Sequence, residues 1–191
     1  REDAASIAAV NETKGQVVFA ENQVAETYFY SVSAGVSAGI KEVWFAKKDR
    51  SYLMPCVLLG DSRKTLDLQK EADFSEFLQG EIKSYDTNSP WYRWRTTVSE
   101  KQLQQFISEK IKSRYEKNPT QIQTKQKDGT FFSTGQTELG EIKKVEILKR
   151  GKSGVAVMAQ ITGSKNTLRI YTEYNLRNLF GGEKLIYLRK D

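Results

Sequence analysis

The sequence predicts an α+β fold made mainly of antiparallel sheets with a few short helices, in one lobe or two. The strongest observation is a pair of segments, residues 141–148 and 155–162, in which apolar side chains alternate across a Gly- and Ser-containing linker. A second observation is a helical apolar stripe in residues 103–115. Because the predicted strands are neighbours in sequence and the helices are few, we expect antiparallel pairing rather than a wound parallel sheet.

The first third of the chain predicts one helix and two strands. Residues 2–11 are rich in helix-forming residues, and Gly15 follows where a left-handed C-terminal turn is favourable. Residues 16–19 and 24–33 predict strands joined by residues 21–23.

The middle of the chain predicts a short helix, a strand and a long helix. A polar surface region, residues 62–87, contains a short helix around Phe74, Phe77 and Leu78, and residues 91–98 predict a strand. Ser99 and Gln102 have the spacing of a capping box, which begins the long helix. Its buried stripe consists of Leu103, Phe106, Ile107, Ile111 and Tyr115.

The last third predicts the hairpin and further short elements. Residues 119–135 are polar and predict a loop or mobile extension. Beyond the hairpin, residues 166–172 predict a third strand, residues 173–179 a short helix ended by Gly181-Gly182, and residues 185–188 a last strand.

Composition limits the classes of function. The 191 residues fit one domain or two small lobes, no segment approaches the ~20 apolar residues of a membrane span, and no secretory leader is recognised. Cys56 is the one cysteine and the chain has no His, so we expect no disulfide within the chain, no metal site and no cofactor. We interpret Cys56, which lies in an apolar run, as a buried small hydrophobe.

Charge is distributed unevenly along the chain. Residues 1–100 hold 12 Lys/Arg against 15 Asp/Glu, giving −3, whereas residues 101–191 hold 18 against 9, giving +9. A basic second half suits an anionic partner such as wall polymer, peptidoglycan carboxylates, an acidic membrane surface or nucleic acid. Each basic cluster has an alternative interpretation as the solvated face of a hairpin.

Several segments together resemble the SpoIID/LytB domain, a family of bacterial cell-wall proteins named for a stage II sporulation protein and an amidase enhancer. The first group is Val10-Asn-Glu-Thr13-Lys-Gly15-Gln-Val17-Val18, Ala25-x-x-Tyr28-Phe29, Ser31-x-Ser33-x-Gly35-x-Ser37, Val43-Trp44 and Ser51-Tyr52-Leu53. The second is Ser89-Pro90-Trp91-Tyr92-Arg93-Trp94, Gly140-Glu-Ile142-x-x-Val145-Glu-Ile147-Leu148-Lys-Arg150 with Ser153-Gly154, Ile161-Thr162-Gly163-Ser164, Leu168-Arg-Ile170 and Asn175-Leu176-Arg177-x-Leu179-Phe180-Gly181.

The resemblance covers essentially the whole chain and corresponds to the later part of the family's domain. It implies residues 1–118 as the region with the small-residue and Trp motifs, and residues 119–191 as the hairpin-rich C-terminal part of the same module. For a full member it implies lytic cleavage of peptidoglycan glycan strands during sporulation or wall turnover. Partners would be glycan strands and other wall hydrolases or engulfment proteins, at an extracytoplasmic location in a Gram-positive-type bacterium, with membrane attachment only through segments outside this chain.

Two family motifs do not occur in this sequence. The "EMP" segment, whose Glu is the family's expected catalytic acid, would lie just before Arg1, and the "GHG" motif requires a His that this chain does not contain. We therefore assign no catalytic residue. Ser nucleophiles would require a positioned base, and the carboxylates Glu26 and Glu42 flank the family motif but have the sequence context of solvated side chains.

The candidate glycan-binding residues are small or aromatic. A segment of small residues allows another surface to approach its backbone, although a tight turn packed under a Trp is an equally good interpretation. Aromatic side chains offer flat faces to sugar rings, and on an ideal strand either Trp91 or Trp94 would be in the core. The candidates are Ser33, Gly35, Ser37, Trp44, Tyr52, Trp91 and Trp94, with Tyr92 beside them.

Two alternative functions are compatible with the sequence. One is a non-catalytic wall-binding or amidase-enhancing module. The other is nucleic-acid binding, because residues 91–95 interleave basic and aromatic side chains. No phosphate-binding glycine motif accompanies them, which makes nucleic acid the weakest alternative.

Overall fold

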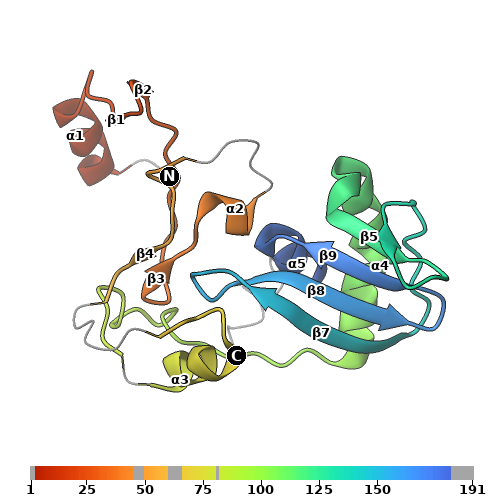
Figure 1. Cartoon of the computed structure of the whole chain (residues 1–191). Coiled ribbons are helices and arrows are strands. Elements are labelled where there is room, and N and C mark those ends of the chain that lie inside the picture. The colour runs from red at the N-terminus through yellow and green to blue at the C-terminus, as the bar shows by residue number, and fades with distance from the viewer. Residues whose placement is uncertain (1–2, 45–49, 60–65, 81, 182–191) are drawn as a thin grey trace. The chain divides into compact units, whose positions relative to one another are not determined.

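The computed structural model describes residues 3–44, 50–59, 66–80 and 82–181 (Figure 1). The chain divides into two units, Arg1–Ser31 and Val32–Asp191, which we call unit 1 and unit 2. The sheets are antiparallel and are accompanied by short helices, so the predicted α+β class is confirmed.

Unit 1 contains one helix and a minimal hairpin. Helix α1 (Ala4–Glu12) begins after Asp3, whose carboxylate accepts a hydrogen bond from the Ser6 N–H at 2.9 Å. Strands β1 (Phe19–Ala20) and β2 (Gln23–Val24) are joined by two residues with positive φ, as in a type I′ turn. The predicted strands 16–19 and 24–33 are therefore mostly wrong, because each strand pairs only with the other and no described residue of this unit is buried.

Unit 2 is organised around a five-stranded antiparallel sheet in the order β6-β5-β9-β8-β7. The predicted hairpin is confirmed as β7 (Ile142–Arg150) and β8 (Ala156–Gly163), and the third strand as β9 (Thr167–Tyr171). The predicted loop 119–135 is wrong. It contains the 3₁₀ turn η1 (Pro119–Gln121), β5 (Ile122–Lys125) and β6 (Phe131–Phe132).

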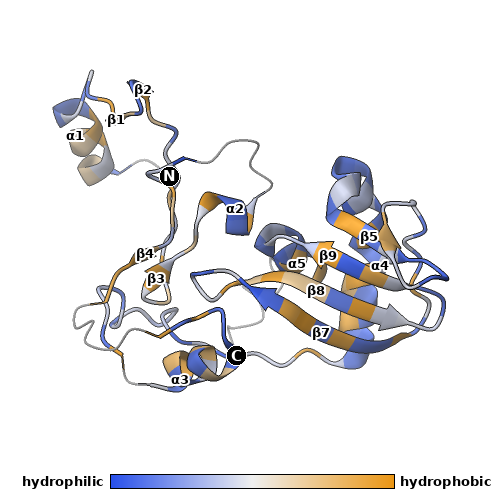
Figure 2. Ribbon diagram, viewed as in Figure 1, coloured by the Kyte–Doolittle hydropathy of each residue, from blue (hydrophilic) through white to orange (hydrophobic). Residues whose placement is uncertain are grey.

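Two helices cover one face of this sheet. Helix α4 (Glu100–Lys117) begins at the predicted capping box, and α5 (Glu173–Leu179) follows β9 (Figure 1). Their apolar residues pack on hydrophobic positions of the strands, which stand out on β5, β8 and β9 in Figure 2. The core comprises Ile107, Ile111, Ile122, Leu139, Ala159, Ile161, Leu168, Ile170, Leu176 and Leu179. Helix α4 lies before residue 119 and the five strands lie after it, so the core is formed from both sides of the predicted boundary between regions 1–118 and 119–191. That boundary stays a prediction.

The remainder of unit 2 consists of short elements. Strands β3 (Val36–Ser37) and β4 (Cys56–Val57) pair antiparallel, and α2 (Ile40–Val43) follows β3. Helix α3 (Glu71–Gln79) confirms the predicted short helix. Cys56 is exposed, so its predicted burial is wrong: a two-residue strand has no sheet above it to cover the side chain. The predicted strand 185–188 lies outside the described residues.

Candidate functional site

The segment of small residues from Ser31 to Ser37 is held by a carboxylate. The backbone N–H and the hydroxyl of Ser33 both donate to Asp86 Oδ2, at 2.7 and 2.6 Å, and Gly35 N–H donates to Ser33 Oγ at 3.1 Å. The Ser33 hydroxyl and then its backbone N–H lower the pKa of Asp86 below 3.8, because they stabilise its ionised form. Asp86 therefore fixes the conformation of a segment more than 50 residues away in sequence.

Gly35 occupies a position that only glycine fills easily. Its φ of +98° is in the left-handed region, and a Cβ here would lie 2.6 Å from Leu59 Cδ2 and 3.4 Å from Tyr92 Oη. Its carbonyl accepts a hydrogen bond from Leu58 N–H at 2.8 Å. Ser33 and Gly35 are both buried, so the structure places these two candidates in the framework of the site, with little surface for direct contact.

Ser37, Trp44 and Tyr52 belong to the adjoining part of unit 2. Cys56 N–H donates to Ser37 Oγ at 3.1 Å across the β3–β4 pair. The loop that contains Tyr52 is connected to α2 through the hydrogen bond from Ile40 N–H to Leu53 O at 2.9 Å, and Trp44 ends that helix with 36% of its surface exposed.

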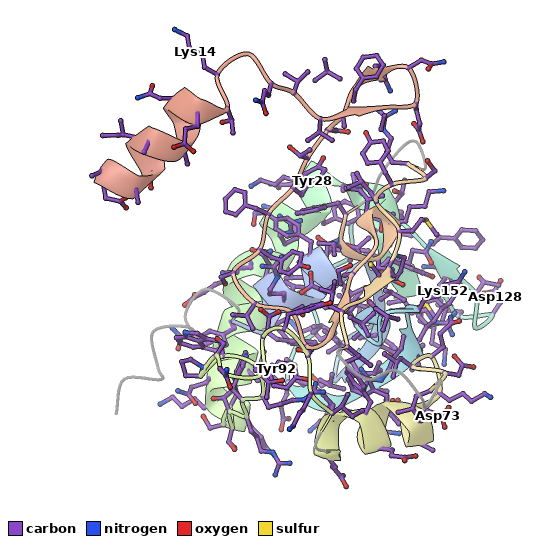
Figure 3. All side chains as sticks on the ribbon, turned by 90° about the vertical axis from the view of Figure 1, so that its left-hand side faces the viewer. Lys14, Tyr28, Asp73, Tyr92, Asp128 and Lys152 are labelled. Carbon is purple, nitrogen blue, oxygen red and sulfur yellow. The ribbon has the colours of Figure 1, made fainter. Side chains whose placement is uncertain are left out.

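In the Trp-containing segment the buried aromatic residue is Tyr92, not one of the tryptophans. Tyr92, labelled in Figure 3, is 9% exposed, and its hydroxyl donates to Ile82 O at 2.7 Å. Trp91 and Trp94 are 42% and 48% exposed. The predicted strand 91–98 and the predicted core Trp are therefore both wrong. Residues 85–93 form turns and bends instead, so the two-residue side-chain period does not apply.

Arg93 connects this segment to α3. Its guanidinium stacks on Phe77 at 4.4 Å and on Tyr92 at 4.6 Å, measured to the ring centroids, and Nη2 donates to Phe77 O at 3.1 Å. Nε and Nη1 of Arg93 are buried without a hydrogen-bond acceptor among the described residues. The backbone that carries Trp91 and Trp94 is therefore attached to α3 and to the interior.

Sequence reasoning did not identify two residues of this region. Tyr85 is 83% exposed on the same turns, and Asp86 is the acceptor described above. The residue composition of 84–90, with Ser, Asp, Thr, Asn and Pro in succession, is a turn signal that could have indicated both. We call the exposed aromatic residues Tyr85, Trp91 and Trp94 the aromatic surface.

Glu42 connects α2 to the β7–β8 turn, residues 151–155. Ser153 Oγ donates to Glu42 Oε2 at 2.5 Å, Ser153 N–H donates to Oε1 at 3.3 Å, and Gly39 N–H donates to Oε2 at 3.1 Å. The predicted solvation of Glu42 is wrong, because the carboxylate accepts hydrogen bonds from buried donors 111 residues away. Glu26 is exposed and accepts a hydrogen bond from the Tyr28 hydroxyl at 3.1 Å.

Arg150, the last residue of β7 before this turn, connects α3 to the same hairpin. It binds Glu71 through two hydrogen bonds, Nε–Oε2 at 2.7 Å and Nη2–Oε1 at 2.9 Å, and its guanidinium stacks on Phe74 at 3.8 Å. Hydrogen bonding and charge from Arg150 lower the pKa of Glu71 below 4.5. The Arg150 and Ser153-Gly154 positions of the family-like motif therefore hold α2 and α3 against the sheet.

The described residues contain no group of three or more His, Cys, Asp or Glu side chains suited to a metal ion. Within the same residues, no helix combines the length and the apolar character needed to cross a membrane.

Residues 38–130 match a family described as a domain of unknown function, DUF8618. No curated protein and no solved structure matches the chain. The matched residues run from the start of α2 through β5 and include Trp44, Trp91 and Trp94.

Proposed function

We propose that this chain is a peptidoglycan-binding part of a cell-wall remodelling protein of the SpoIID/LytB type, which acts outside the cytoplasm. The observation that carries the proposal is the aromatic surface, where two exposed Trp side chains project from a backbone fixed by Tyr92 and Arg93. Flat aromatic rings match the apolar C–H faces of saccharide rings, and a rigid backbone lowers the entropy lost on binding.

Two carboxylates, Asp86 near the aromatic surface and Glu71 of α3, do not have the pKa shift of a general acid. A general acid that protonates a glycosidic oxygen requires a raised pKa, yet Asp86 and Glu71 have lowered pKa values. Glu173 has its pKa raised by burial, and its carboxylate is ion-paired with Arg177 at 2.9 Å within α5. Glycan cleavage is therefore proposed for the full family member, whose expected acid belongs to another segment.

A non-catalytic wall-binding or amidase-enhancing module uses the same surface and is the second candidate. It is favoured by the engagement of the Glu42 carboxylate with Ser153, which makes Glu42 a structural acceptor. Incubating purified glycan strands with the chain separates these functions from catalysis. We expect no anhydro-sugar ends above the buffer control, and their release would contradict the assignment of binding alone.

The binding experiment uses insoluble peptidoglycan and three variants of the chain. We expect Trp91→Ala and Trp94→Ala each to weaken retention about fivefold or more, since buried aromatic contacts at interfaces commonly contribute over ~1 kcal/mol. Phe132→Ala is the matched control, because Phe132 is 58% exposed on β6. Unchanged retention of both Trp variants at unchanged melting temperature would contradict the proposal. Any basic contribution should decrease as salt rises to physiological strength.

A further inference from the structure

The sheet of unit 2 has a second face, opposite α4 and α5, which we call the open face. Cross-strand pairing places one residue set on it, because directly paired residues point to the same side. None of these residues is buried, whereas the other face contains the core. The set is Gln123, Lys125, Phe131, Lys144, Glu146, Lys149, Met158, Gln160, Thr162, Thr167, Arg169 and Tyr171.

The open face has an excess of positive charge. It carries four basic side chains, Lys125, Lys144, Lys149 and Arg169, against the one carboxylate of Glu146. Lys144 pairs with Glu146 at 2.7 Å, so the charges of the other three remain uncompensated by acidic residues of this face. An anionic ligand fits this distribution.

Arg169 is fixed at the centre of the open face. Its guanidinium stacks on Phe131 at 3.8 Å, and Nε donates to Gln160 Oε1 at 3.4 Å. The two terminal amino groups have no acceptor among the described residues, and such a planar pair matches an oxygen pair of a carboxylate or phosphate. Arg169 covers one face of the Phe131 ring, and single-stranded DNA is therefore included in the test below as the alternative anionic ligand.

Neutral polar groups surround Arg169. Gln123 and Gln160 lie beside it on the adjacent strands, and Thr162 and Thr167 are paired across β8 and β9. Amide and hydroxyl groups hydrogen-bond readily to sugar hydroxyls. We propose that the open face binds a linear polysaccharide that carries carboxylates. This inference rests on the proposed function only for the ligand class, a glycan, and it assigns a second surface to unit 2.

The test uses polygalacturonate as the carboxylated polysaccharide, dextran as a neutral one, and single-stranded DNA. We expect the chain to bind polygalacturonate in preference to dextran. Arg169→Gln should weaken this binding about fivefold or more, and Arg169→Lys should restore only part of it, because lysine lacks the planar fork. The matched control is Lys112→Gln, which removes the same charge from an exposed position of α4 on the opposite side of the sheet.

The outcomes separate the two surfaces. Equal weakening by Arg169→Gln and Lys112→Gln would overturn the proposal, since net charge alone would then explain binding. If the chain binds single-stranded DNA as tightly as polygalacturonate and Arg169→Gln abolishes the DNA binding too, the open face would be assigned to nucleic acid instead. If Arg169→Gln lowers the melting temperature, the Lys125→Gln/Lys149→Gln double variant tests the same face. The aromatic surface is tested by retention of the Trp variants on insoluble peptidoglycan and the open face by binding of Arg169→Gln to polygalacturonate, so failure of the aromatic surface and failure of the open face are distinguishable.

Discussion

Tyr92 provides the sharpest test of how the Trp-containing segment is held. Its ring is 9% exposed between Arg93 and Gly35, and its hydroxyl donates to Ile82 O at 2.7 Å. Emptying such a large aromatic site costs ~3–5 kcal/mol, so we expect Tyr92→Ala to lower the free energy of unfolding by that amount. Tyr92→Phe keeps the ring and loses one hydrogen bond, which corresponds to ~0.5–1.5 kcal/mol.

The neighbouring tryptophans should contribute much less to stability than Tyr92. Trp91→Ala and Trp94→Ala remove exposed side chains, so each should change the free energy of unfolding by less than ~1 kcal/mol. Urea unfolding followed by far-UV circular dichroism measures all four variants without depending on Trp fluorescence. If either Trp variant were as destabilising as Tyr92→Ala, the assignment of Tyr92 to the interior and the tryptophans to the surface would be refuted.

Two further predictions concern the β7–β8 turn. Gly154→Ala should destabilise the fold more than Gly129→Ala, by roughly 1–3 kcal/mol in urea unfolding. Both glycines have φ near +86°, but only at position 154 would an added Cβ lie 2.7 Å from Phe74 Cδ2. Equal effects of the two substitutions would exclude a packing role for Gly154. The lowered pKa of Glu71 means that its pairing with Arg150 stabilises the fold above pH 4.5 and is lost as the pH falls through the lower folded-state pKa. Glu71→Gln should therefore flatten the acid-induced decrease in melting temperature, and an unchanged pH profile would contradict this.

The elements with a strong local signal could be predicted from the sequence. The β7–β8 hairpin, β9, α4 with its capping box, and α5 each combine a hydrophobic period with a start or stop signal. Strand β5 was missed because its four residues include one large aliphatic side chain, Ile122. Its other buried residue, Thr124, satisfies its hydroxyl by donating to Gln136 O at 2.9 Å.

The sequence indicates which residue types form the candidate site, but it does not indicate how they are arranged. The sequence marks Trp91, Tyr92 and Trp94 as aromatic, but which one is buried depends on Arg93 and Phe77, which meet only in the folded chain. Likewise, Glu42 has the context of a surface residue until Ser153, 111 positions later, supplies its hydrogen bonds. Local patterns contain no information about such distant partners.

The contacts of the β7–β8 turn determine which pieces of this chain can be studied separately. The family match covers residues 38–130 and so includes Glu42 and Glu71, but it stops before Ser153 and Arg150. A fragment with those limits would also lack β9, the strand beside β5. Its acidic side chains would lose their donors and α4 would expose its apolar stripe to water. The matched segment therefore lacks strands and donors that its own residues contact in the folded chain, and a fragment prepared for study should extend through β9 and α5.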